Sequence, residues 1–330
     1  MGSLTPPFST GAGAQVSGSA TQSQTTASIA VVIPAYNMDW CVARAVASCQ
    51  NQSLAVREII IVDDCSTDNT RAVVDELMSR DSRISYHRLQ QNSGHLAALT
   101  FGAQKSTSDW IVLLDADDEL TPNSVRARID AANSYVAETG VTPQLVYGDH
   151  DATRFVRLRG NSFRYLCREL SLCQTSTIML GKECIPSLPI SDNPWNTDDE
   201  IVLGIGKGFH ILHSGAVVTK YNSHNSRTRM SGDPRKVFMG VRQLVHDHRA
   251  DILREHGLWW LFLWRLRVLR AFLRYQIAMA NSTINRSTAS SSELTREWRR
   301  QPWRAYRKGL RYCQDALSRF LSKYFVHDYF

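Results

Sequence analysis

The chain has few cysteines, and none in the arrangement that a zinc site or a disulfide framework would need. Only seven cysteines occur among 330 residues, the number is odd, and no pair is spaced Cys-x-x-Cys. Scattered thiols of this kind are typical of reduced cysteines in a cytosolic protein. We therefore expect neither structural zinc nor a disulfide framework.

Long uninterrupted apolar runs are also missing. The N-terminus has no basic stretch followed by an apolar run, so it does not predict a secretory signal. The longest apolar stretch, residues 258–280, is interrupted by four arginines, and arginine is costly deep in a bilayer. We expect a cytoplasmic protein whose membrane contact is limited to a peripheral one at the cytoplasmic face.

Positive charge is concentrated at one end of the chain. The formal net charge is +7, yet residues 254–330 hold 15 Lys and Arg against 5 Asp and Glu, whereas residues 1–253 hold 23 against 26. Two interpretations remain open for the Trp- and Arg-rich part of this segment. One is a helix lying on anionic lipid, and the other is an amphipathic helix packed on the rest of the chain or on a second subunit. Binding of nucleic acid is not expected, because no recognition motif accompanies the basic residues.

The order of residue types predicts three regions. Residues 1–27 are rich in Ser, Thr, Gly, Ala and Gln, which predicts a disordered tail. Residues 28–256 alternate short apolar runs with helical stretches, which predicts an α/β domain with a mostly parallel, Rossmann-like sheet flanked by helices. Residues 257–330 are expected to form a basic helical extension. The strands expected in the first half of the chain cover residues 29–33, 58–62, 84–88, 110–114 and 145–147.

Four polar loops follow predicted strands, at Pro34–Asn37, Asp63–Asn69, Gln91–Gly94 and Asp115–Glu119. Ligands of open α/β sheets bind beyond the carboxyl ends of the strands. We therefore expect these loops to meet at one crevice, where two of them bring paired carboxylates.

The loop Asp115-Ala116-Asp117-Asp118-Glu119 holds four carboxylates in five positions. Like charges this close repel each other unless a cation is present, and oxygen ligands suit Mg²⁺ or Mn²⁺. The alternative is an acidic loop that begins the next helix. In the other acidic loop we expect Asp64 to bind ligand and Asp68 to cap a helix.

Taken together and in order, the segments Val31–Asn37, Val62–Thr70, Asn92–Gly102 and Leu114–Asp118 resemble the family 2 glycosyltransferases of the GT-A fold. The resemblance covers about residues 28–225. It implies metal-dependent transfer of a sugar, with inversion, from a nucleotide-diphosphate donor such as a UDP-sugar to an acceptor hydroxyl.

The resemblance also implies roles for single residues. Asp64 would hydrogen-bond the base, and Asp115 would contact the ribose or the sugar. Asp117 would hold the metal, Mn²⁺ or Mg²⁺, and His224 would reach the metal or the diphosphate. The full set of donor-binding residues is Pro34, Ala35, Tyr36, Asp64, Asn92, Gly94, Asp115 and Ala116.

The acidic base motif of the family, often Glu-Asp, best matches Asp198 and Asp199. Thr197 stands where the family has Glu, and Gly204 where it commonly has Arg. Asp198 or Asp199 is expected to deprotonate the acceptor hydroxyl. The alternative is an acid-rich helix N-terminus, which the helix dipole favours.

Other classes of α/β protein fit the sequence less well. A dinucleotide-dependent oxidoreductase should carry Gly-x-Gly-x-x-Gly after the first strand, where this chain has Pro-Ala-Tyr-Asn. A sugar nucleotidyltransferase would carry a phosphate loop rich in Gly, Arg and Lys at the same place. A catalytically inactive scaffold with the same fold stays open as an alternative.

Overall fold

The computed structural model describes residues 27–167, 173–188, 197–206, 208–222, 234–259, 261–266 and 268–269. The predicted tail, His224 and most of the C-terminal extension lie outside these residues. The six described cysteines are all free.

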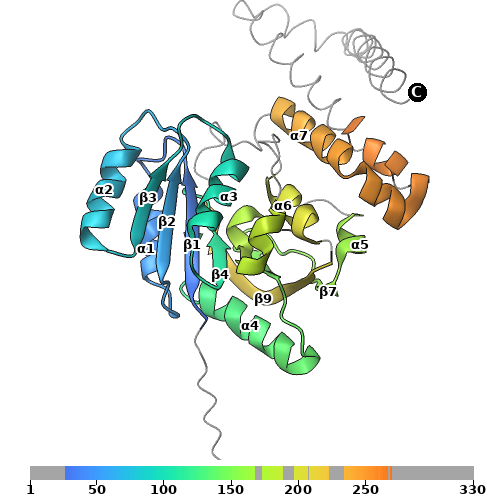
Figure 1. Cartoon of the computed structure of the whole chain (residues 1–330), viewed down its shortest axis with the longest axis horizontal. Coiled ribbons are helices and arrows are strands. Elements are labelled where there is room, and N and C mark those ends of the chain that lie inside the picture. Colours follow the sequence, from blue (N-terminus) through green and yellow to red (C-terminus); the bar gives the residue numbers. More distant parts are fainter. Residues whose placement is uncertain are drawn as a thin grey trace, which may run out of the picture.

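A nine-stranded sheet forms the centre of the described chain, in the order β3-β2-β1-β4-β8-β6-β9-β5, with β7 paired to β9 (Figure 1). Its strands are β1 (Ile29–Ala35), β2 (Glu58–Asp63), β3 (Ile84–Arg88), β4 (Trp110–Leu113), β5 (Glu119–Leu120), β6 (Leu145–His150), β7 (Arg159–Asn161), β8 (Ile178–Gly181) and β9 (His210–Lys220). The helices are α1 (Val42–Gln50), α2 (Thr70–Arg80), α3 (His95–Lys105), α4 (Ser124–Thr139), α5 (Phe163–Leu166), α6 (Thr197–Gly206) and α7 (Pro234–Asp247), with short 3₁₀ turns η1 (Thr175–Thr177) and η2 (Lys182–Ser187).

The α/β fold that the alternating pattern predicts is confirmed. Strands β3, β2, β1 and β4 pair in parallel, which places their carboxyl ends at one edge of the sheet. Beyond β4 the sheet is mixed: β8 runs antiparallel between β4 and β6, and β6 pairs in parallel with β9. A buried strand is a run of apolar residues whether it runs parallel or antiparallel to its neighbours. The sequence therefore could not predict that β8 runs antiparallel to β4 and β6.

The side chains of β1 alternate between two cores on opposite faces of the sheet. Val31 and Ile33 pack in a core with residues of α1, α2 and α4. Ala30 and Val32 pack in a second core with residues of α3, α6 and α7. Burial on both faces explains why this strand is a continuous apolar run.

Helix α3 lies directly on β1 and β2 because Gly102 has no side chain. A Cβ atom at this position would lie 2.5 Å from Val32 Cγ1 and 2.9 Å from Val62 Cγ2, too close for any side chain. This close approach fixes the axis of α3, and therefore the place of its first residue, His95, at the carboxyl edge of the sheet.

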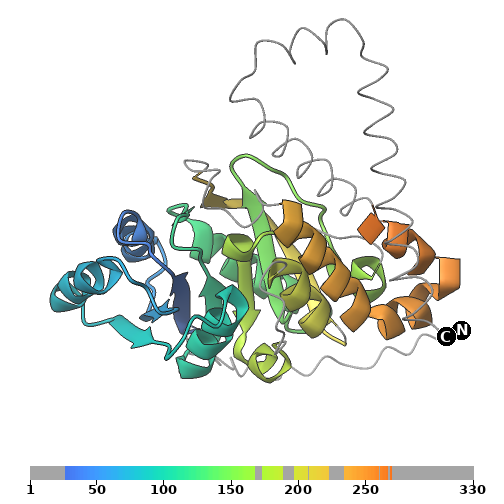
Figure 2. The same ribbon diagram turned by 90° about the horizontal axis from the view of Figure 1, so that it is seen from above.

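The core continues past the boundary predicted at residue 257. Residues 249–259 and 261–266 are helical, and Leu261, Trp264 and Val268 are buried in the core that α3 and α6 share. Together with α7 these residues lie at the opposite end of the molecule from α1 and α2 (Figures 1 and 2). No described helix is both long and apolar enough to cross a membrane. The division of the chain into three regions stays a prediction.

Candidate functional site

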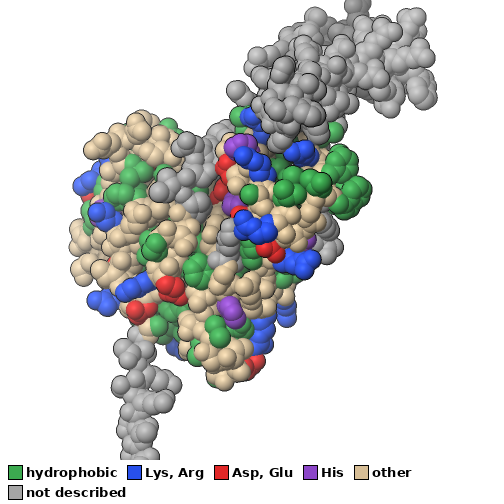
Figure 3. All heavy atoms as spheres, turned by 45° about the vertical axis from the view of Figure 1, so that its right-hand side comes forward, with side chains coloured by type: hydrophobic (Ala, Val, Ile, Leu, Met, Phe, Trp, Pro, Cys, Tyr) green, Lys and Arg blue, Asp and Glu red, His purple; other side chains and the backbone are tan. Residues whose placement is uncertain are grey.

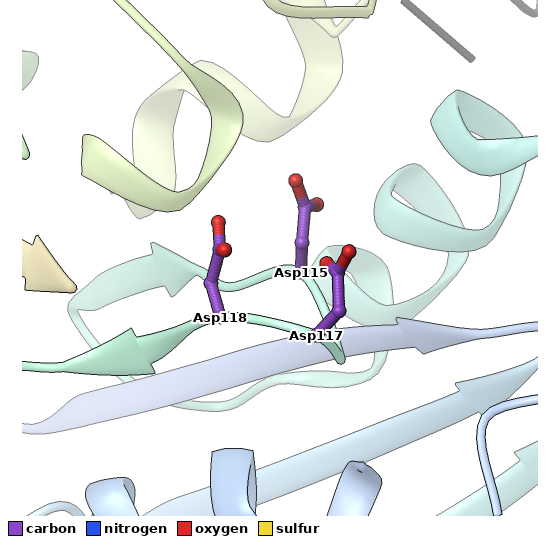
Figure 4. A group of neighbouring side chains, drawn as sticks. All are labelled: Asp115, Asp117 and Asp118. Atoms are coloured by element: carbon purple, nitrogen blue, oxygen red, sulfur yellow. The ribbon is translucent and has the colours of Figure 1, made fainter. Parts of the chain in front are cut away.

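Three carboxylates meet in the loop that follows β4. Asp115, Asp117 and Asp118 each place an oxygen atom within 4.8 Å of the others, and their side chains point to the same side of the loop (Figure 4). The loop leads into β5, and the next helix, α4, begins only at Ser124. The alternative that these acids begin a helix is therefore wrong.

Asp118 is the most buried of the three carboxylates, at 3% exposed. Its carboxylate accepts hydrogen bonds from Ser176 Oγ (2.8 Å) and from the backbone amide of Asn222 (3.2 Å). Burial, followed by the negative charges of Asp115 and Asp117, raises the pKa of Asp118 to about 7. The cluster is therefore short of positive charge at neutral pH.

Two neutral side chains from distant parts of the sequence hold this loop. The Ser176 hydroxyl accepts a hydrogen bond from the backbone amide of Asp115 at 3.1 Å. The Asn222 Nδ2 donates to the carbonyl oxygen of Asp117 (3.1 Å) and to a carboxylate oxygen of Glu119 (3.0 Å). Neither residue was predicted from the sequence, since no local pattern marks a contact across such a separation.

Asp64 holds the loop that precedes α3. One oxygen of its carboxylate accepts the amide of Ser93 at 2.6 Å, and the other accepts the amide of Gly94 at 2.8 Å. Gly94 has a φ of 90°, a conformation that favours glycine. Asp64 thus shapes the predicted site through the backbone, while its contact with a nucleotide base stays a prediction.

The sequence analysis assigned no role to the neighbouring Asp63. Its carboxylate is fully buried and accepts hydrogen bonds from the Ser66 amide (2.7 Å), from Arg88 Nη1 (2.9 Å) and from the Tyr86 hydroxyl. It therefore fixes the loop after β2 against β3.

The remaining donor-binding residues that the resemblance implied lie along the same edge. Pro34 and Ala35 are buried at the end of β1, and the carbonyl of Ala35 accepts the amide of Asp64 at 2.8 Å. Tyr36, the next residue, is 45% exposed. Asn92 is exposed and Ala116 is buried. Four chain segments thus adjoin at the carboxyl edge, although their contacts with a donor stay predictions.

His95 links the acidic loop to α6. Its Nε2 lies 2.7 Å from Asp115 Oδ1, and its Nδ1 lies 3.1 Å from Thr197 Oγ1. Burial alone would lower the pKa of His95, but the charge of Asp115 and the hydrogen bond to it, with Asp198 and Asp117 adding, outweigh burial and raise this pKa. The sequence analysis assigned His95 no role, although it lies within one of the four segments of the resemblance.

The two base candidates lie in the first turn of α6. Burial raises the pKa of Asp198 to about 6; the amides of Asp199 and Asp198 oppose this rise, the charge of Asp115 adds to it, and His95 opposes it. Asp199 is buried, and its amide donates to Asp198 Oδ1 at 3.1 Å. The next residue, Glu200, is also buried and pairs with His248 Nε2 at 3.3 Å. Because the charges of Asp115 and His95 both affect the pKa of Asp198, this carboxyl shares the electrostatic environment of the acidic loop.

Comparison with known proteins bears on both the family and the fold. Residues 30–179 match the model described as glycosyl transferase family 2. This segment, a little under half of the chain, is therefore a family 2 glycosyltransferase segment.

Two curated relatives and two solved structures illustrate the likeness. An uncharacterised glycosyltransferase of Haemophilus influenzae is 29% identical over 31% of this chain and 41% of its own length. A GalNAc(5)-diNAcBac-PP-undecaprenol beta-1,3-glucosyltransferase of Campylobacter jejuni is 34% identical over 32% of this chain and 34% of its own length. The match thus spans less than half of either relative.

Among solved structures, the mannosyltransferase PcManGT of Pyrobaculum calidifontis, in complex with GDP-Man and Mn²⁺, aligns with a TM-score of 0.53 at 17% identity, over 90% of this chain and 88% of that one. Residues 1–349 of S. aureus TarS with UDP-GlcNAc align with a TM-score of 0.50 at 15% identity, over 76% of this chain and 80% of that one. These likenesses support the GT-A fold.

The raised pKa of Asp118 predicts how stability depends on pH. Between its ordinary value of 3.8 and about 7, the folded chain holds a proton that the unfolded chain has released. Raising the pH through this range therefore weakens the folded state. We expect this carboxyl to lower the thermal midpoint on going from about pH 5.5 to about pH 8, and Mn²⁺ to raise the midpoint more at the higher pH, where the carboxylates are charged.

The measurement is thermal unfolding at both pH values, with Mn²⁺ or with EDTA. The Asp118→Asn variant, which lacks the titrating carboxyl, should show a smaller change with pH. An equal stabilisation by Mn²⁺ at both pH values would contradict the expectation.

Proposed function

We propose that the chain transfers a sugar from a UDP-sugar to an acceptor hydroxyl, with a divalent cation and with inversion at the anomeric carbon. The observation that carries this proposal is the cluster of Asp115, Asp117 and Asp118 at the carboxyl edge of a GT-A sheet. The likeness to structures that hold GDP-Man with Mn²⁺ or UDP-GlcNAc agrees with it. The sugar and the acceptor are left open.

The residues present fit a divalent cation. Three carboxylates offer hard oxygen ligands within 4.8 Å of one another, and their mutual repulsion contributes to the raised pKa of Asp118. Asp117 would hold Mn²⁺ or Mg²⁺ with Asp115 and Asp118 beside it. When bound, the cation neutralises charge on the departing nucleoside diphosphate. His224, the further ligand implied by the resemblance, lies outside the described residues.

Asp198 is the general base in this proposal, because it is less buried than Asp199 and senses the charge of Asp115. Its carboxylate removes the proton from the acceptor hydroxyl. The acceptor oxygen forms a bond to the anomeric carbon from the side opposite the diphosphate, and the bond from that carbon to the diphosphate oxygen breaks. A base with a pKa of about 6 is charged at neutral pH, yet it is stronger than an ordinary carboxylate.

Removal of the central carboxylate tests the enzyme proposal. Asp117→Ala should reduce transfer by at least about 100-fold, because charge on the leaving group is no longer compensated, while the circular dichroism spectrum is unchanged. The measurement is release of UDP from a panel of UDP-sugars with Mn²⁺. Asp75→Ala, on the exposed side of α2, is the matched control and should keep full activity. Full activity of Asp117→Ala refutes the metal role, and no release by the wild type with any donor identifies an inactive scaffold.

The raised pKa of Asp198 predicts the acid limb of the pH profile of kcat. Since the base must be deprotonated, kcat should fall as the pH drops below about 6. Asp198→Asn should lower kcat by about 100-fold and remove this limb. A pH profile of kcat between about pH 5 and pH 8 measures both effects. Loss of the limb in Asp199→Asn instead would assign the base to Asp199.

We also propose that the helices after α7 dock on an anionic membrane surface. While Trp264 is buried, Leu258 is 76% exposed and Trp259 is 66% exposed, and Phe262 stacks on Trp259 with ring centroids 5.6 Å apart. Hydrophobic side chains lie beside Lys and Arg on this side of the molecule (Figure 3). Aromatic and apolar side chains beside cations suit the interface of an anionic bilayer.

Substitution of the exposed aromatic pair tests this docking without disturbing the core. Trp259→Ser with Phe262→Ser should reduce co-sedimentation with vesicles that contain phosphatidylglycerol, because apolar area no longer enters the interface. Val156→Ser, which removes an exposed apolar side chain elsewhere, should pellet like the wild type. Equal pelleting of all three proteins, or equal pelleting with neutral phosphatidylcholine, refutes the membrane proposal.

A further inference from the structure

His95 is a half-buried histidine at the carboxyl edge of the sheet. Its side chain is 19% exposed and that of Asp115 is 31% exposed, so the pair is partly open to solvent and does not lie in either core. Both ring nitrogens of His95 have partners on different elements: Asp115 in the loop after β4, and Thr197 at the start of α6. The imidazole therefore spans the gap between the donor side and the base side of the proposed site.

The direction of these two hydrogen bonds follows from the chemistry of the partners. An ionised carboxylate can only accept, so Nε2 of His95 carries a hydrogen and donates to Asp115. In the neutral ring Nδ1 then accepts from the hydroxyl of Thr197, which can donate. The charged ring, which the raised pKa of His95 favours, joins the same two partners by donating at both nitrogens, because the Thr197 hydroxyl can also accept.

The backbone that carries His95 is fixed from two sides. The preceding amides of Ser93 and Gly94 are held by the buried carboxylate of Asp64. Further along α3, Gly102 sets the helix directly on Val32 and Val62. A side chain on such a rigid support can hold its partners within a few tenths of an ångström, which is what a preorganised site requires.

We propose that His95 is a positioning residue that holds Asp115 and the first turn of α6 in one geometry, so that the base on Asp198 faces the donor side. This inference rests on the proposed function. Asp198 follows Thr197 directly, so a displacement of Thr197 moves the base as well. A displacement of about 1 Å between reacting groups can lower a rate by about 100-fold.

Two substitutions and their combination test the link. His95→Phe keeps a ring but loses both hydrogen bonds, and it should lower kcat by about 100-fold. The dissociation constant of UDP with Mn²⁺, measured by calorimetry, should change by a smaller factor than kcat, because the proposed role of His95 is to set the geometry between Asp115 and the base on Asp198. Thr197→Val keeps the shape of the side chain and should lower kcat by about tenfold.

The combined variant distinguishes a link from two separate structural defects. If His95 acts through Thr197, adding Thr197→Val to His95→Phe should lower kcat little further, whereas independent defects would multiply. His95→Gln, whose amide can donate to Asp115 in place of Nε2, should recover part of the lost kcat. His246→Gln, at the exposed end of α7, is the matched control and should behave like the wild type.

Hydrogen exchange gives a readout that does not depend on turnover. Amides in the first turn of α6 and in the loop of Asp115 should exchange faster in His95→Phe and in Thr197→Val, with the remaining helices unchanged. Unchanged exchange in α6, full kcat in His95→Phe, or multiplying defects in the combined variant would overturn the positioning role. A wild type that releases UDP from no donor, but shows this exchange pattern, would refute the proposed function and leave the link in place.

Discussion

Electrostatic repulsion among three carboxylates is the constraint around which the carboxyl edge of this sheet is built. Asp115, Asp117 and Asp118 each place an oxygen within 4.8 Å of the others, and carboxylates this close disfavour one another's charge unless donors or a cation offset it. The donors come from three separate elements: His95 from α3, Ser176 from η1, and Asn222 from the residue pair after β9. The acidic loop is therefore held by parts of the fold that the sequence places far away.

The dependence of the acidic loop on residues distant in the sequence explains which parts of the fold and site could be predicted. The strands β1 to β4 follow from buried apolar runs and were predicted within a few residues of their observed ends, because a strand buried on both faces of a parallel sheet is apolar throughout. The acidic loop and the base candidates were found because carboxylates after a strand, or before a helix, are visible in the sequence itself. The proposed roles of these residues go beyond what periodicity can show.

The residues that were missed share a different property. Ser176 lies 61 positions from Asp115, and Asn222 lies 104 positions from Asp118. No local pattern encodes such pairs, because they arise only when β8 and β9 join the sheet. His95 is 102 positions from Thr197, so its position in a conspicuous segment gave no sign of its second partner. The alternative that the acidic loop begins the next helix is wrong for a related reason: Glu119 and Leu120 form β5, which pairs with β9.

The contact between Glu200 and His248 has a consequence for how the chain can be divided. Glu200 is 1% exposed, and removal of His248 would take a partner from a carboxylate that water cannot reach. Trp264 and Val268 fill the same core from still later in the chain. A fragment that ended at residue 179, where the match to the family model ends, would lack α6, His248 and the later residues that fill this core. The segment that matches the family model is therefore shorter than the stretch of chain that contributes to the core.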